Sequence, residues 1–196
     1  PIKVIHPNSS YKVSDKINVD FINITHSTPQ TALLAIHTPY GTIIYSNDFK
    51  LDSSPMLGSK PNFDKILAQK NAIAMITDCT RAWDAKKTPS EAVAKEMLRD
   101  VMMSTDSEGK AIIVTTFSSH LARLKSIVEF GKIKNRRIVF LGRSLAKYVD
   151  AGRKAGIVNF PDVEIVKYRQ AISKKLKKIS KNPQDYLLVV TGHQGE

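Results

Sequence analysis

Helices and strands that alternate in the second half of the chain are the feature that most constrains its fold. Apolar runs of strand character there are separated by segments with the spacing of amphipathic helices. This alternation predicts a parallel sheet with right-handed crossovers, and so an α/β fold class. The expected strands cover residues 111–116, 137–141 and 186–191, and the expected helices cover 119–130, 144–155 and 170–180.

The first half has a different rhythm, because short β-branched runs follow one another with little helical spacing between them. Thr38-Pro39-Tyr40-Gly41 reads as a hairpin turn between two of these runs. We therefore expect a sheet-dominated unit in which one helix, at 62–70, is the exception. The expected strands cover residues 2–5, 17–24, 32–36, 42–45 and 72–77.

A helix-start signal lies near the change of rhythm. Thr88-Pro89-Ser90-Glu91 reads as a capping box with Pro89 at the first helical position. We place a domain boundary just before it, so that residues 1–83 form one domain and residues 84–196 the next.

The 196 residues have a formal net charge of +12, and this charge is unevenly distributed. Residues 1–83 contain 8 Lys and Arg against 6 Asp and Glu, whereas residues 84–196 contain 22 against 12. Such an excess favours a polyanionic partner such as RNA. The alternative is that a Lys-rich segment such as residues 174–178 is only the solvated face of a helix.

Composition disfavours several classes of protein. No apolar run is long enough to cross a bilayer and the first residues do not form a signal peptide, which predicts a cytoplasmic protein with no membrane partner. Cys79 is the single cysteine, so an internal disulfide or a cysteine-based zinc cluster is excluded. Any metal ligands must therefore be histidines and carboxylates.

Polar residues follow each predicted strand of the second half. In open parallel sheets, ligands bind at the carboxyl ends of the strands, where helix N-termini and glycines expose N–H groups to an anion. We therefore predict phosphate binding there, with the alternative that Ser118 and Ser144 only cap helices. The phosphate-binding candidates are Ser118, Ser119, His120, Arg143, Gly192 and His193.

Two candidate metal ligands stand at strand ends of the first half. His26 follows the strand expected at 17–24, and Asp48 follows the predicted hairpin. A neutral imidazole suits Zn²⁺ or Mn²⁺, and a carboxylate can bridge two ions. The alternative reading is that His26 is a hydrogen-bonded structural residue.

Six segments, in a fixed order and covering nearly the whole chain, carry a resemblance to a known family. They are Thr25-His26-Ser27-Thr28-Pro29, Asn47-Asp48-Phe49-Lys50-Leu51-Asp52, Asp78-Cys79-Thr80-Arg81-Ala82, Thr116-Phe117-Ser118-Ser119-His120-Leu121-Ala122-Arg123-Leu124, Gly142-Arg143-Ser144 and Thr191-Gly192-His193-Gln194-Gly195-Glu196. The series resembles the metallo-β-lactamase nucleases with a β-CASP insertion, above all the RNase J group, in its archaeal type.

The resemblance implies a fold, a reaction and three site residues. The fold is part of a metallo-β-lactamase αββα core followed by a β-CASP domain, and the reaction is hydrolysis of RNA phosphodiesters with two zinc ions. In the terms of that family, His26 is a ligand of one ion, Asp48 bridges both, and Asp78 is the first β-CASP acid. The family also allows a homodimer.

Departures from the family pattern limit what this chain can do by itself. Asn47 stands where the family usually has Gly, and His193 stands where bacterial relatives have Ser. The His-x-His-x-Asp-His motif, which supplies most of the metal ligands, does not occur in these residues. One zinc ion normally takes three or four protein ligands. We therefore expect an internal fragment of a longer enzyme, inactive by itself.

Two other functions stay open from the sequence. A non-catalytic RNA-binding module would have the same basic second half, and Asp48→Ala would leave its function intact. A small-molecule hydrolase of the same superfamily would need no basic cleft. Whether cleavage is endonucleolytic or exonucleolytic is also left open.

Overall fold

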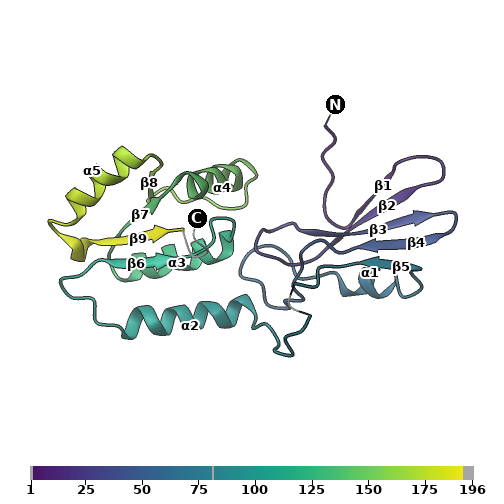
Figure 1. Ribbon diagram of the computed structural model, residues 1–196, viewed down its shortest axis with the longest axis horizontal. Coiled ribbons are helices and arrows are strands. Elements are labelled where there is room, and N and C mark those ends of the chain that lie inside the picture. Colours follow the sequence, from purple (N-terminus) through teal and green to yellow (C-terminus); the bar gives the residue numbers. More distant parts are fainter. Residues whose placement is uncertain (1, 81, 192–196) are drawn as a thin grey trace. The chain divides into compact units, whose positions relative to one another are not determined.

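The computed structural model describes residues 2–80 and 82–191, and the chain divides into two compact units, 1–91 and 92–196 (Figure 1). None of the described helices is both long and apolar enough to span a membrane. The predicted domain boundary after Trp83 stays a prediction. The units are considered one at a time.

The first unit is a five-stranded sheet in the order β1-β2-β3-β4-β5. Neighbouring strands from β1 to β4 are antiparallel, and β5 pairs with β4 in parallel. The strands are β1 (Ser9–Lys12), β2 (Asn18–Asn23), β3 (Ala32–Thr38), β4 (Gly41–Tyr45) and β5 (Ala74–Ile76), and the helix is α1 (Phe63–Leu67).

One face of this sheet forms the core of the unit. The register pairs Ile22 with Leu33 and Ala35 with Ile44, so these side chains project from the same face. All four are buried, and Ile66 of α1 packs against them. The opposite face has half-buried apolar residues, namely Phe21, Leu34, Ile36 and Ile43. In the αββα core expected from the resemblance, a second sheet would cover this face.

The second unit confirms the expected parallel sheet flanked by helices. The order β6-β9-β7-β8 places the last strand inside the sheet, and all three pairings are parallel. The strands are β6 (Ile112–Thr115), β7 (Arg137–Leu141), β8 (Glu164–Val166) and β9 (Tyr186–Val190), and the helices are α2 (Glu91–Ser104), α3 (Leu121–Ile133), α4 (Arg143–Lys154) and α5 (Arg169–Ile179).

The helices of the second unit cover both faces of its sheet. Helix α3 lies so close to the face of Ile138 and Leu187 that a Cβ on Gly131 would meet Ile138 at 3.0 Å. Helix α4 packs beside α3, since Gly152 lies against Leu121. Helix α5 covers the other face, where Ile179 packs among β-strand side chains of the core.

One predicted strand does not form, and two strands of the structure were not predicted. Residues 2–5 form no strand in the described part of the chain, and Ile2 is 97% exposed, because apolar alternation makes a strand only where a partner strand accepts it. Strands β1 and β8 were not predicted. Both lie at sheet edges and are polar or only three residues long, so their sequence signal is weak.

Candidate active site

The carboxyl ends of β2, β4 and β5 meet at one edge of the first sheet. Strands β2 and β4 both run opposite to β3, and β5 runs with β4, so all three point the same way. His26, Asp48 and Asp78 follow these three strands. The sheet therefore collects the three predicted residues at one edge, which we call the candidate edge.

Thr25 ties the segment of His26 to the segment of Asp48. It forms an isolated antiparallel bridge with Lys50, whose N–H donates to the Thr25 carbonyl over 2.7 Å. The buried Thr25 hydroxyl donates to the Lys50 carbonyl and accepts the N–H of Asp52 at 3.0 Å. The two segments are thus fixed against each other by backbone and hydroxyl contacts.

The turn that presents Asp48 explains the departure at Asn47. Its backbone has a φ of 54°, in the left-handed region that Gly and Asn adopt with least strain. The Asn47 amide also donates to the carbonyl of Ala32 over 3.0 Å. Asparagine therefore supplies the backbone conformation that glycine supplies in the family pattern.

We expect Asn47→Ala to destabilise the chain by about 1–2 kcal/mol, because alanine is strained in the left-handed region and loses the amide contact. Asn47→Gly is the matched variant, since it keeps the conformation and loses only the amide, and it costs less. Chemical denaturation of the three proteins measures the difference. Equal midpoints for the alanine and glycine variants would show that the backbone conformation is unimportant.

Ser46 connects the ends of β4 and β5. Its side chain is fully buried, and its hydroxyl lies 3.1 Å from the Thr77 hydroxyl and accepts the N–H of Asp78 at 3.4 Å. The Ser46 N–H donates to the carbonyl of Ile76 over 3.0 Å. Parallel pairing therefore continues past the strands and holds Asp78 beside the segment of Asp48.

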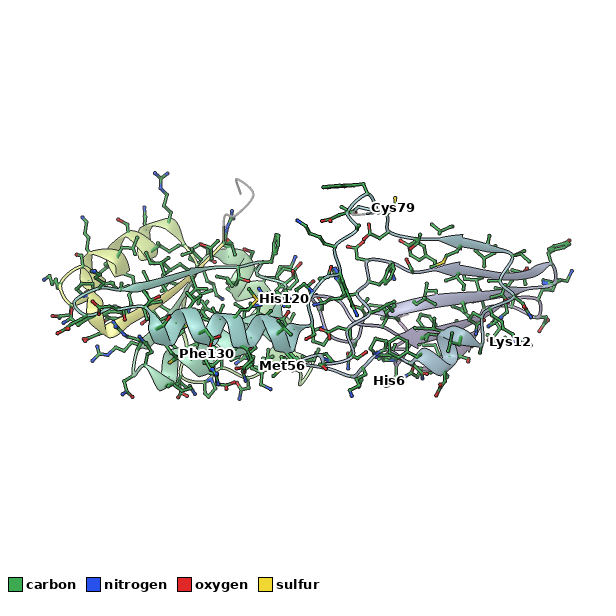
Figure 2. All side chains as sticks on the ribbon, turned by 90° about the horizontal axis from the view of Figure 1, so that it is seen from below. His6, Lys12, Met56, Cys79, His120 and Phe130 are labelled. Atoms are coloured by element: carbon green, nitrogen blue, oxygen red, sulfur yellow. The ribbon has the colours of Figure 1, made fainter. Side chains whose placement is uncertain are left out.

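Asp78 is an exposed carboxylate on the loop that also contains Cys79, which Figure 2 labels. The Thr80 hydroxyl lowers the pKa of Asp78 most, and the Thr80 N–H, which donates over 3.0 Å, lowers it further. His26 is near enough for its charge to act in the same direction. Asp78 is therefore a carboxylate that stays ionised and can accept hydrogen bonds.

The donors at the candidate edge suit zinc in type but are too few in number. His26 and Asp48 are exposed, and both imidazole and carboxylate are ordinary zinc ligands. Among the residues that the structure describes, no group of three histidines, cysteines or carboxylates lies close enough to hold a metal ion. The described residues thus offer part of a ligand set.

Asp52, at the same end of the sheet, has no role predicted from the sequence. Its carboxylate is 4% exposed and accepts the N–H of Ser54 at 2.8 Å and the N–H of Glu91 at 2.7 Å. Burial raises its pKa, but these two hydrogen bonds and the ammonium of Lys50 outweigh burial, and the net pKa is lowered. Asp52 is a buried anion that ties together three segments of the first unit.

In the second unit, the expected strand ends also share one edge. Because β6, β7 and β9 are parallel, the segments that follow them lie together, and the N–H of Thr116 continues the ladder to Val190 over 3.2 Å. Arg143 is exposed at the start of α4. Gly192 and His193 lie outside the described residues.

The capping alternative for Ser118 and Ser144 is wrong. His120, labelled in Figure 2, is the N-cap of α3, and its Nδ1 accepts the N–H of Arg123 at 3.4 Å. The N-cap of α4 is Gly142, and Ser144 is inside the helix. The half-buried Ser118 and Ser119 precede α3 without capping it, and their contact with phosphate stays a prediction.

The predicted start of the next helix is also wrong, by two residues. Helix α2 begins at Glu91, not at Pro89, and the N–H of Glu91 donates to the distant Asp52. A local reading of the sequence could not find this partner, which is 39 residues away.

His37 belongs to a separate cluster at the far end of the sheet. Its Nε2 lies 2.9 Å from Asp20 and its Nδ1 lies 3.0 Å from the Thr42 hydroxyl, while the Ser10 hydroxyl donates to the same carboxylate over 2.5 Å. His37 is at the carboxyl end of β3, whereas His26 follows the oppositely directed β2. It contributes nothing to the candidate edge.

Known proteins resemble both the second unit and the chain as a whole. The family model described as "Ribonuclease J, beta-CASP domain" matches residues 109–196. Ribonuclease J of Pyrococcus abyssi is 38% identical over 94% of this chain, and that of Methanocaldococcus jannaschii is 38% identical over all of it. The chain belongs to the ribonuclease J family. Its expected archaeal type agrees with these two relatives; a cyanobacterial ribonuclease J, from Synechocystis, is 30% identical.

Ribonuclease J proteins are longer than this chain, which spans 42% and 45% of the two archaeal relatives. A crystal structure of an Enterococcus faecalis protein of unknown function shares the fold, with a TM-score of 0.59 and 18% identity. That likeness covers 99% of this chain and 46% of the other. It supports the α/β architecture and nothing finer.

Proposed function

We propose that the protein containing this chain is a metal-dependent ribonuclease that hydrolyses RNA phosphodiesters, with two zinc ions as its cofactor. The observation that carries the proposal is the meeting of His26, Asp48 and Asp78 at one sheet edge in a member of the ribonuclease J family. The cytoplasmic location and the homodimer stay predictions.

Each residue of the candidate edge has a distinct role in this proposal. His26 would hold one ion through a ring nitrogen, and Asp48 would hold both through its two oxygens. Bound zinc would supply an activated water and stabilise the leaving oxygen. Asp78, whose pKa is lowered further by Thr80, would be ionised and would accept a hydrogen bond from a histidine or orient groups around the phosphate.

The second unit would bind the RNA. Segments at the carboxyl ends of its parallel strands offer helix starts and Arg143 to phosphate oxygens. The excess of Lys and Arg in residues 84–196 supports a polyanionic partner. The proposed phosphate contacts are Ser118, Ser119, His120, Arg143, Gly192 and His193.

Cleavage of a 5′-labelled single-stranded RNA tests the proposal, with the complete protein and this chain compared in Zn²⁺, in Mn²⁺ and in EDTA. We expect the complete protein to cleave only with metal, and this chain to be inactive because its donor set is incomplete. A complete protein that binds RNA without cleaving it under any metal condition would instead be a non-catalytic RNA-binding module. Cleavage in EDTA would contradict metal dependence.

A further inference from the structure

A strongly basic helix lies on one face of the second unit's sheet. Residues 167–181, which include α5, contain seven Lys and Arg and no Asp or Glu. An open groove of about 510 Å³ runs between α5 and the edge strand β8. We call it the α5 groove; it is lined by Glu164, Val166, Ala171, Lys174, Lys175, Lys177, Lys178 and Lys181.

The single acidic residue of the α5 groove is already neutralised. Glu164 forms an ion pair with Lys175 at 2.5 Å, and Lys175 also lies over the ring of Tyr186, 5.2 Å from its centroid. The Lys175 side chain is only 13% exposed. Lys175 therefore stabilises the wall of the groove through Glu164 and Tyr186. The positive charge available to a ligand comes from the neighbouring lysines.

Four exposed lysines supply that charge. Lys174, Lys177, Lys178 and Lys181 line the groove and form no ion pair with any other described residue. Three of them, Lys174, Lys177 and Lys178, span about 6 Å along α5 at 1.5 Å of rise per residue, and Lys181 lies in the turn that follows the helix. A strand of nucleic acid with one phosphate per ~3.4 Å of axis presents about two to three phosphates to these lysines.

We propose that the α5 groove is a second RNA-binding surface, which holds the phosphate backbone of a single strand. The choice of RNA over other polyanions rests on the proposed function. A membrane surface is disfavoured because two of the three large apolar residues of α5, Ile172 and Ile179, pack into the core, and Leu176 alone, 42% exposed, is too little apolar surface to insert. Tyr168, which is outside the groove lining but 67% exposed at the N-cap of the same helix, offers an aromatic face of the kind on which bases stack.

The triple variant Lys174→Gln, Lys177→Gln and Lys178→Gln tests the groove. Binding of the chain to a labelled 20-nucleotide poly(U) is measured as a function of salt. Three lost phosphate contacts flatten the slope of log K against log salt by about 2 units and weaken binding about tenfold at low salt. The matched control, Lys16→Gln, Lys60→Gln and Lys70→Gln, removes the same charge from exposed positions of the first unit and keeps the slope.

Two results would overturn the proposal. The first is an unchanged slope of log K against log salt in a groove variant whose thermal unfolding matches that of the wild-type chain. The second is that polyglutamate competes for the chain as effectively as RNA of equal charge, which would indicate an acidic protein partner. Neither result affects metal-dependent cleavage by the complete protein, so failure of the groove and failure of the proposed function are distinguishable.

Discussion

We expect Asp48→Asn to lower the proposed metal-dependent RNA cleavage by the complete protein by about 10³-fold. The amide keeps the size of the side chain but removes its charge and leaves one oxygen, so it cannot bridge two cations. The turn geometry survives, because the left-handed backbone belongs to Asn47 and the bridge between Thr25 and Lys50 does not involve the Asp48 side chain. Single-turnover cleavage and the zinc content per protein are the measurements.

Asp64→Asn is the control for the Asp48 experiment. Asp64 is an exposed carboxylate in the first turn of α1, in the same unit but in an element outside the candidate edge. It should retain both the rate and the metal content. An Asp48 variant that cleaves within tenfold of the wild type and keeps its zinc would remove Asp48 from the site.

Asp52→Ala should destabilise the chain by about 3 kcal/mol. The substitution leaves the N–H groups of Ser54 and Glu91 without their acceptor and the ammonium of Lys50 without its buried partner. Chemical denaturation at neutral pH measures the loss. Asp106→Ala is the control, because Asp106 accepts the N–H of Glu108 at 2.9 Å in an exposed turn, and this change should cost about 0.5 kcal/mol or less.

The destabilisation caused by Asp52→Ala should decrease as the pH is lowered. The folded-state pKa lies below the ordinary value of 3.8, so the carboxylate contributes stability above about pH 4 and loses it as the pH falls through the folded-state pKa. The stability gap between wild type and Asp52→Ala should therefore narrow on acidification below about pH 4. A gap that stays constant down to pH 2 would show that hydrogen bonding to the ionised form is not the cause.

Regular elements with a strong local signal could be predicted from the sequence. The strand at 137–141 lies where it was expected, and α3, α4 and α5 begin and end within a few residues of the expected bounds. These segments combine apolar periodicity with burial on a sheet, so local preference and tertiary packing agree. Their alternation was enough to predict that the strand ends of the second unit's sheet would share an edge.

Features that depend on distant partners could not be predicted. Asp52 is an ordinary acidic residue in the sequence, and only the fold brings the N–H of Glu91 to it. His120 was expected to face phosphate, yet its ring also caps α3. The left-handed backbone at Asn47 could have been found, because Asn in place of a family glycine is a sign of that conformation.

The location of bound zinc tests the central claim most directly. Crystals of the complete protein grown with Zn²⁺ would be measured on both sides of the zinc absorption edge. Two anomalous peaks are expected, both about 2.0–2.2 Å from oxygens of Asp48 and one at a similar distance from a ring nitrogen of His26. Peaks that avoid both residues, or that lie beside His37 instead, would contradict the assignment of the candidate edge as the metal site.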